Sequence, residues 1–195
     1  MVESLLVIGV HREELAFGDQ VASLMDDSKF DVMRIPSGIS NTQTGTGGGF
    51  YYQTEHREIY LQLHQQVKRQ YRLIVDLHCG STEQGNYAEV FSRDDRFIHC
   101  MSARLKERDW QQQVRVIKII AELSTKNPGK PENYILPQAR TWIPEKVWND
   151  QAYRYVGLEV YLSHGRQGKP EDWAFTQQLI ETIRLCDEST NDSEK

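Results

Sequence analysis

The sequence predicts an α/β protein: a single domain of three layers, α/β/α, in which helices cover both faces of a mixed, mostly parallel sheet. Aliphatic runs of strand length alternate along the chain with segments of helical periodicity, which is the pattern of such folds. The first strands are almost continuously apolar, as strands are when both faces of a sheet are covered. The length of 195 residues suits one domain with its own core.

Two periodicities define the expected elements. Runs rich in aliphatic and β-branched side chains predict strands, which cover residues 4–10, 30–35, 72–78, 87–91, 114–120 and 155–162. Apolar residues spaced three and four apart predict helices. One such face contains Phe17, Val21, Leu24 and Met25, a second contains Ile59, Leu63 and Val67, and a third, within residues 171–186, contains Trp173, Leu179, Ile183 and Cys186. In this kind of fold ligands bind at the carboxyl ends of the strands.

The boundaries of the domain follow from composition. We expect one domain over residues 1–187 and a disordered polar tail over residues 188–195. Residues 36–53 are dense in glycine, serine and threonine and lack a hydrophobic period, so they predict a long loop. That loop is either a plain surface segment or a lid over a substrate. A phosphate-binding P-loop is excluded because no lysine follows the glycine run.

Charge and hydropathy restrict the partners. The net charge of −5 gives no basic surface for nucleic acid, and no apolar run reaches the roughly 20 residues of a membrane span. The acidic start is unlike a secretory signal, so we expect a cytoplasmic protein. We expect a small molecule as its partner, with no nucleic acid and no membrane. The sequence does not predict an oligomeric state.

Cysteine spacing predicts neither a disulfide framework nor a thiolate zinc site. The three cysteines, Cys79, Cys100 and Cys186, are odd in number and isolated, without a C-x-x-C pair. We therefore expect three reduced thiols.

The stretch LLVIGVHREEL raises the question of a metal site. His11 and Glu14 follow the first predicted strand, and side chains three apart at a helix start can point to the same side. The alternative is a solvated helix start, where acidic residues interact favourably with the helix dipole.

A second strand, in LIVDLHCG, ends in the same way. His78 follows the aliphatic run, and Asp76, two residues earlier, lies on the same face of the strand, where its carboxylate can orient the imidazole. A buried core histidine is the alternative. Together His11, Glu14 and His78 make a set of two nitrogens and one carboxylate, which leaves a fourth position on zinc for water. Such an open set predicts catalysis.

Glu159 lies inside the hydrophobic run YVGLEVYL. Glutamate is rarely buried without a partner, so it either faces solvent on an edge strand or points into a polar cavity. In a cavity, desolvation would raise its pKa toward that of a general base.

These three segments resemble a known family. GVHREEL resembles the G-x-H-x-x-E-L zinc motif of the aspartoacylase and succinylglutamate desuccinylase branch of the zinc carboxypeptidase-like superfamily. VDLHCG resembles its D-L-H strand, and YVGLEVYLSHG resembles its V-G-[IL]-E-V strand. The motifs occur in the family's order between residues 5 and 165. The resemblance implies the zinc carboxypeptidase or phosphorylase/hydrolase-like form of the α/β/α fold.

The resemblance also implies a function. His11, Glu14 and His78 would bind one Zn²⁺ per chain, and Glu159 would be the catalytic base and acid. The expected enzyme is a zinc-dependent hydrolase that cleaves an amide bond of an N-acyl amino acid or a small peptide. Zinc polarises a water molecule, and Glu159 takes its proton and passes it to the leaving nitrogen.

The sequence departs from the family at the residues expected to bind substrate. Members usually carry an Asn-Arg pair that this chain lacks, so Arg34 is our candidate for stabilising the oxyanion, with Asn41 on the following loop as a substrate contact. Arg57 is another arginine that could substitute, by its position in the sequence, for the missing pair. Arg140 and Arg154 are candidates for binding a substrate carboxylate. For each arginine a surface ion pair is the alternative.

The second departure is length, because many aspartoacylase-like enzymes continue into a β-rich C-terminal domain. The cleft is therefore expected to be more open, or to be covered by the 36–53 loop or by a neighbouring subunit. Candidate lining residues are His164, Tyr161, Tyr51, Tyr52 and Trp142. These departures keep two other hypotheses open. The first is a metal- or small-ligand-binding protein with the same fold and little turnover, and the second is an α/β protein without a metal.

Overall fold

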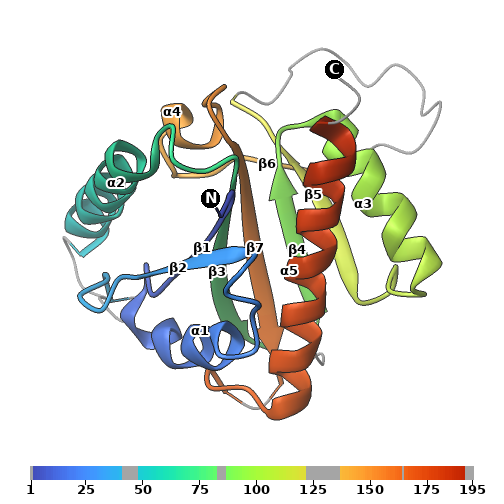
Figure 1. Ribbon diagram of the computed structural model, residues 1–195. Helices are drawn as coiled ribbons and strands as arrows, with labels where there is room; N and C mark the ends of the chain where they lie inside the picture. Colours follow the sequence, from blue (N-terminus) through green and yellow to red (C-terminus); the bar gives the residue numbers. More distant parts are fainter. Residues whose placement is uncertain (1, 41–47, 83–86, 122–136, 164, 192–195) are drawn as a thin grey trace, which may run out of the picture.

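The chain folds around one seven-stranded sheet, seen in the computed structural model, which describes residues 2–40, 48–82, 87–121, 137–163 and 165–191 (Figure 1). The strand order is β2-β1-β3-β7-β4-β5-β6. The strands are β1 (Ser4–Ile8), β2 (Phe30–Arg34), β3 (Leu73–Ser81), β4 (Tyr87–Ser92), β5 (Val114–Ile119), β6 (Gln138–Ala139) and β7 (Arg154–Leu162). All neighbouring strands are parallel except β4 and β7, which pair antiparallel. The prediction of a mixed, mostly parallel sheet is confirmed.

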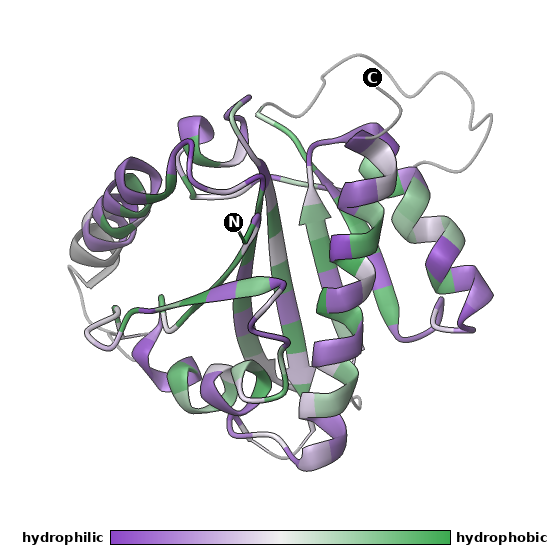
Figure 2. Ribbon diagram, in the orientation of Figure 1, coloured by the Kyte–Doolittle hydropathy of each residue, from purple (hydrophilic) through white to green (hydrophobic). Residues whose placement is uncertain are grey.

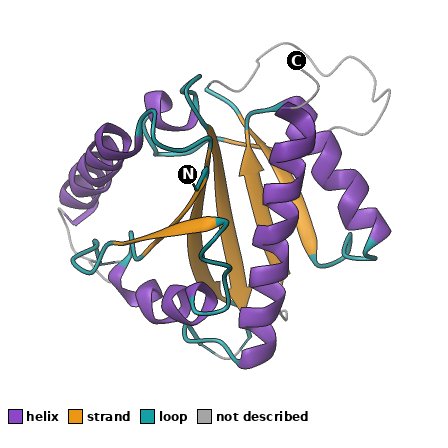
Figure 3. Cartoon of the chain, viewed as in Figure 1, coloured by secondary structure: helices purple, strands orange, loops and turns teal. Residues whose placement is uncertain are grey.

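Helices cover both faces of this sheet (Figures 1 and 3). α2 and α4 pack on one face, and α1, α3 and α5 pack on the other. Their bounds are α1 (Leu15–Ala22), α2 (Gly48–Val67), α3 (Asp95–Glu107), α4 (Glu145–Trp148) and α5 (Pro170–Asn191), and a short 3₁₀ helix, η1 (Arg12–Glu14), precedes α1. The three-layer prediction is confirmed. Among the described residues no helix is long and apolar enough to cross a lipid bilayer.

Alternation along the strands divides the core in two. On β3, Leu73, Val75 and Leu77 pack toward α1, α3 and α5, whereas Ile74 packs toward α2. Figure 2 shows hydrophobic colour along much of the strands and a mixed pattern along the helices. The face toward α2 also carries Asp76 and His78 of β3 and Glu159 of β7, so the candidate site lies on this face.

Each predicted strand is present, but three details of the sequence prediction are wrong. Leu24 is 46% exposed because α1 ends at Ala22. Residues 48–53, predicted as loop, form the first turns of α2. Residues 188–191, predicted as part of the disordered tail, belong to α5, which ends at Asn191. α3, α4 and the two-residue strand β6 lie outside the elements predicted from the sequence.

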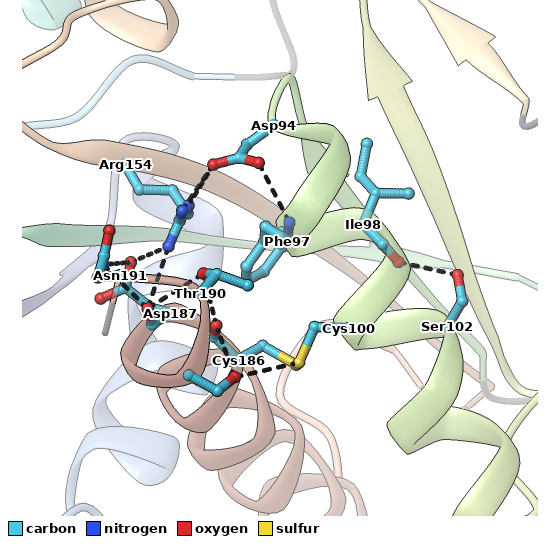
Figure 4. The surroundings of a disulfide bond; sticks show 11 residues. Asp94, Phe97, Ile98, Cys100, Ser102, Arg154, Cys186, Asp187, Thr190 and Asn191 are labelled. Carbon is cyan, nitrogen blue, oxygen red and sulfur yellow. Dashed lines mark hydrogen bonds and ion pairs between the residues drawn. A yellow bond between two sulfur atoms is a disulfide. The ribbon is translucent and has the colours of Figure 1, made fainter. Parts of the chain in front are cut away.

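A disulfide joins Cys100 of α3 to Cys186 of α5, with 5.7 Å between the Cα atoms (Figure 4). The prediction of three reduced thiols is therefore wrong for this pair, because the fold brings together two cysteines that are 86 positions apart. Cys79 is a free, buried thiol. Disulfides persist mainly in oxidising compartments. The expected cytoplasmic location stays a prediction.

We expect the double variant Cys100→Ser/Cys186→Ser to lower the free energy of unfolding by about 2–4 kcal/mol, because the bond closes a long loop and restricts the unfolded chain. Urea unfolding followed by circular dichroism measures the difference. Wild-type protein in dithiothreitol should match the double variant. Identical unfolding curves for oxidised wild type and the variant would contradict the bond.

Candidate metal centre and active site

The chain turns sharply after β1 and presents His11 at the carboxyl end of the sheet. Gly9 has a φ of 82°, and a Cβ there would lie 2.9 Å from the carbonyl oxygen of Ile35, so this turn requires glycine. Ile39 then fixes the next residues: its N–H donates to the carbonyl of Val10 at 2.9 Å, and its own carbonyl accepts from the N–H of Arg12 at 3.0 Å. His11 is held between these two bonds.

The 3₁₀ turn of η1 brings Glu14 back to His11. The N–H of Glu14 donates to the carbonyl of His11 at 3.0 Å, and the carboxylate oxygen Oε1 lies 2.9 Å from His11 Nδ1. Glu14 is only 4% exposed. The alternative of a solvated helix start is therefore wrong for Glu14.

His78 of β3 completes the cluster from the neighbouring strand. Its Nδ1 lies 3.0 Å from Glu14 Oε2 and 3.3 Å from His11 Nδ1. One ligand atom from each of His11, Glu14 and His78 lies within 4.8 Å of the others. Residues far apart in sequence thus converge at one point.

This donor set fits a zinc ion. Two nitrogens bound to tetrahedral zinc at about 2.0–2.1 Å lie about 3.3 Å from each other. The two Nδ1 atoms are separated by 3.3 Å, and a carboxylate lies beside both. Imidazole and carboxylate are also the ligand types of catalytic zinc sites with three protein ligands.

The charges of the cluster favour a cation between the side chains. Burial alone would raise the pKa of Glu14, but hydrogen bonds with His11 and His78 and the charges of both rings lower it from 4.5 to about 2. Burial likewise opposes charge on His78, but Asp76 and Glu14 raise its pKa well above 6.5. The carboxylate is ionised at neutral pH, so the site is built to receive positive charge.

Asp76 orients His78 from the other side of the ring. Its Oδ2 lies 3.2 Å from His78 Nε2 and accepts hydrogen bonds from the hydroxyls of Tyr60 and Tyr155, both at 2.6 Å. Asp76 is fully buried, and burial would raise its pKa, but His78 and the two tyrosines lower it to about 2. The orienting contact predicted for Asp76 is present, and it leaves Nδ1 of His78 facing Glu14 and His11.

Glu159 lies beside His78 on the central strand β7, not on an edge strand. In the sheet register His78 pairs with Glu159, and Glu159 pairs with Glu89 of β4. Burial, opposed by His78 and reinforced by Glu14 and Glu89, raises the pKa of Glu159 from 4.5 to about 7. A Cβ at position 80 would lie 3.3 Å from its Oε1, so Gly80 leaves space for this carboxylate.

A cavity of about 330 Å³ connects these side chains. His11, His78 and Glu159 line it together with Arg140 and a third histidine, His56. Apolar side chains supply much of the remaining wall, among them Phe91, Ile119 and Trp142. The cavity therefore places candidate metal ligands, a candidate base and one arginine around a space that suits a small ligand.

Arg140 is the one predicted arginine that lies in this cavity. Arg34 is 52% exposed, and its Nε donates to Asp19 Oδ1 of α1 at 2.8 Å, so it does not line the cavity. The prediction that Arg34 stabilises an oxyanion is not supported, because the side chain is used in a surface ion pair. Arg57 is exposed on α2.

Arg154 also lies away from the candidate site. It begins β7, five residues before Glu159, which is about 17 Å along a strand. It pairs with Asp94, the N-cap residue of α3, and with the fully buried Asp187 of α5, as Figure 4 shows. The prediction of a substrate contact at Arg154 is therefore wrong, and this arginine ties two helices to the sheet.

Other predicted residues divide between the cavity and elsewhere. Trp142 lines the cavity and is 66% exposed. Tyr161 stacks on Tyr87, with 4.3 Å between ring centroids, and its hydroxyl donates to Glu89. Asn41, His164 and the side chains of Tyr51 and Tyr52 lie outside the described residues.

His56 was not predicted from the sequence. It is 8% exposed, and its ring packs 4.8 Å from the ring of Tyr60 and 6.1 Å from that of His11. The helical period could have found it, because His56 lies four residues before Tyr60 on the buried face of α2.

Solved structures with similar folds include three hydrolases. Murine aminoacylase 3 is 14% identical over 98% of this chain and 66% of its own, with a TM-score of 0.45. A bacteriophage poly-gamma-glutamate hydrolase is 10% identical over 98% and 86%, with a TM-score of 0.48. A succinylglutamate desuccinylase from Silicibacter sp. TM1040 is 11% identical over 94% and 56%, with a TM-score of 0.44.

This chain thus spans about two thirds or less of the length of the aminoacylase and the desuccinylase. No family model matches the sequence, and no curated protein matches it.

We expect Asp76→Asn to weaken zinc binding about 10–100-fold, since a partner that orients a ligand imidazole typically has an effect of this size. Competition with a chromogenic chelator measures the affinity. His78→Ala should abolish tight binding, because it removes a ligand. Asp19→Asn, which alters only the surface partner of Arg34, serves as the control. Equal zinc affinity in wild type and His78→Ala would rule out this site.

Proposed function

We propose that the protein is a zinc-dependent hydrolase that cleaves the amide bond of an N-acyl amino acid or a small peptide. The observation that carries the proposal is the position of Glu159, a carboxyl with a pKa of about 7, in one cavity with His11 and His78. A general acid–base group works best when its pKa is near the operating pH.

His11, Glu14 and His78 would hold the metal, with Asp76 fixing the ring of His78. Bound there, zinc would polarise the amide carbonyl and lower the pKa of a water molecule to about 7. Glu159 accepts a proton from the attacking water and later donates it to the leaving nitrogen. Near pH 7 both protonation states of this carboxyl are populated, so both transfers are available to it.

Arg140 is our candidate for binding a carboxylate of the substrate. It is the one arginine among the described residues that line the cavity. A guanidinium binds a carboxylate through two parallel hydrogen bonds, which fixes the orientation of the substrate as well as its charge. The adjacent Trp142 and the apolar wall would contact its uncharged part.

A metal- or small-ligand-binding protein with little turnover is the second candidate. It is favoured by the surface ion pair of Arg34, because this leaves the proposed oxyanion without the arginine expected from the sequence. The two candidates differ in what Glu159 does. A binder needs its ligands but not a proton-transferring carboxyl.

The first test is hydrolysis of N-acetyl, N-formyl and N-succinyl amino acids and short peptides by zinc-loaded protein. We expect Glu159→Gln to lower kcat by about 10²–10⁴-fold, because the amide cannot accept the proton, while zinc content stays unchanged. Amine release measures kcat, and elemental analysis measures zinc. Full activity in Glu159→Gln would contradict the proposed mechanism, and binding without hydrolysis of any substrate would favour the second candidate.

A matched pair of variants tests Arg140. Arg140→Met should raise KM about 10–100-fold, since a hydrogen bond to a charged group contributes about 1.5–3 kcal/mol. Arg34→Met should change KM less than about threefold, because Arg34 pairs with Asp19 at the surface and does not line the cavity. With substrates whose carboxylate is converted to an amide, wild type and Arg140→Met should have the same KM. If Arg140→Met raises KM equally for substrates with a free carboxylate and with an amidated one, carboxylate binding by Arg140 is contradicted.

A further inference from the structure

His56 is a third histidine in the cavity, contributed by α2 rather than by the sheet. It lines the same space as His11, His78 and Glu159, and it is 8% exposed. The three candidate ligands come from η1, the chain just before it, and β3, so His56 approaches from a separate layer of the fold. His56 is not one of the three candidate metal ligands, and it takes no part in the proton transfer proposed for Glu159.

The ring of His56 is held in place on two sides. It lies nearly parallel to the ring of His11, with an angle of 25° and 6.1 Å between centroids. It also packs at 54° on the ring of Tyr60, with 4.8 Å between centroids. Tyr60 is itself fixed, because its hydroxyl donates to the fully buried Asp76. A ring in such a setting is preorganised, which is the requirement for a group that stabilises a transition state.

The proposed reaction needs a hydrogen-bond donor that His56 can supply. Attack on an amide carbonyl places negative charge on its oxygen, and removing one donor to such an oxyanion typically costs about 10²–10³-fold in rate. Arg34, the arginine expected for this task, is engaged with Asp19 at the surface. An imidazole has at least one ring N–H in either protonation state, so His56 can donate a hydrogen bond.

We propose that His56 donates a ring N–H to the carbonyl oxygen of the bound substrate and to the oxyanion that forms from it. This inference rests on the proposed hydrolase function and assigns its oxyanion contact to α2. His56 exchanges no proton and forms no covalent bond in this role. The amide oxygen is thereby held between the metal side of the cavity and the helix that covers it.

Two substitutions distinguish hydrogen-bond donation by His56 from packing of its ring. His56→Phe keeps an aromatic ring for contact with Tyr60 but has no donor, and His56→Gln keeps an N–H donor without the ring. We expect His56→Phe to lower kcat about 100-fold with little change in KM, and His56→Gln to recover at least tenfold of that loss. Zinc content should be the same in all three proteins.

A second residue of α2 provides the control for helix packing. His64 is 7% exposed, and its Nδ1 lies 2.9 Å from the hydroxyl of Tyr153, outside the cavity lining. His64→Phe should lower the melting temperature but leave kcat within about threefold of wild type. If His64→Phe reduces kcat as strongly as His56→Phe, or if His56→Gln is as slow as His56→Phe, the donor role is wrong.

A binding measurement gives a readout that does not depend on turnover. Acetohydroxamic acid presents a carbonyl oxygen to a zinc site, and calorimetry of zinc-loaded protein gives its Kd. We expect the Kd to rise about tenfold in His56→Phe and to recover in His56→Gln. If this pattern appears in a protein that hydrolyses none of the screened amides, the His56 contact stands and the hydrolase proposal fails. If wild type hydrolyses amides but His56→Phe changes neither kcat nor Kd by more than threefold, the His56 contact is overturned.

Discussion

The architecture of the site depends on one buried anion, the carboxylate of Asp76. It is completely shielded from solvent, and a charge in such a position is tolerated only when it is paired and hydrogen-bonded. Two tyrosine hydroxyls and the ring of His78 meet at its Oδ2, whereas Oδ1 has no hydrogen-bond partner among the described residues. The groups that stabilise this buried charge are therefore concentrated on the side of Asp76 that faces His78.

This arrangement determines which nitrogen of His78 is available. Because Nε2 faces Asp76, Nδ1 faces Glu14 and His11. A cation held by Nδ1 would supply positive charge next to two buried carboxylates, without requiring His78 to carry protons on both nitrogens. Without this anion, the hydroxyl of Tyr60, 3.1 Å from Nε2, would be the remaining polar contact on that side of the ring. The candidate metal site and the buried network are thus one electrostatic unit.

Charged residues on the neighbouring strands of the sheet continue this electrostatic unit. The register aligns His78, Glu159, Glu89 and Arg115 in one row across β3, β7, β4 and β5. Glu89 is buried and pairs with the exposed Arg115 of β5, so the negative charge beside Glu159 is partly balanced by this arginine. Glu159 is left with burial as the main influence on its pKa, and this keeps its proton within reach near neutral pH.

Sequence patterns predicted what is local and periodic. The strand runs were identifiable because β-branched residues cluster within them, and His11, Glu14, His78 and Glu159 were identifiable because a polar residue interrupts or ends a buried strand. The α2 helix was only half predicted, since its first residues are glycine and polar residues without a hydrophobic period. The Cys100–Cys186 bond was not predictable, because it joins α3 to α5 and cysteine spacing does not report which helices are neighbours.

The arginines show most clearly where sequence reasoning ends. Arg34, Arg140 and Arg154 look alike in sequence, each near a predicted strand or loop, yet the carboxylate partners of Arg34 and Arg154 lie on other elements of the fold. Asp187 of α5 binds Arg154 at one end of β7, and Asp19 of α1 binds Arg34 at the surface. A guanidinium can act on a ligand only if the fold supplies no closer carboxylate in its place. Tertiary contacts of these long side chains decide that outcome, and of the three arginines Arg140 is the one that lines the cavity with Glu159.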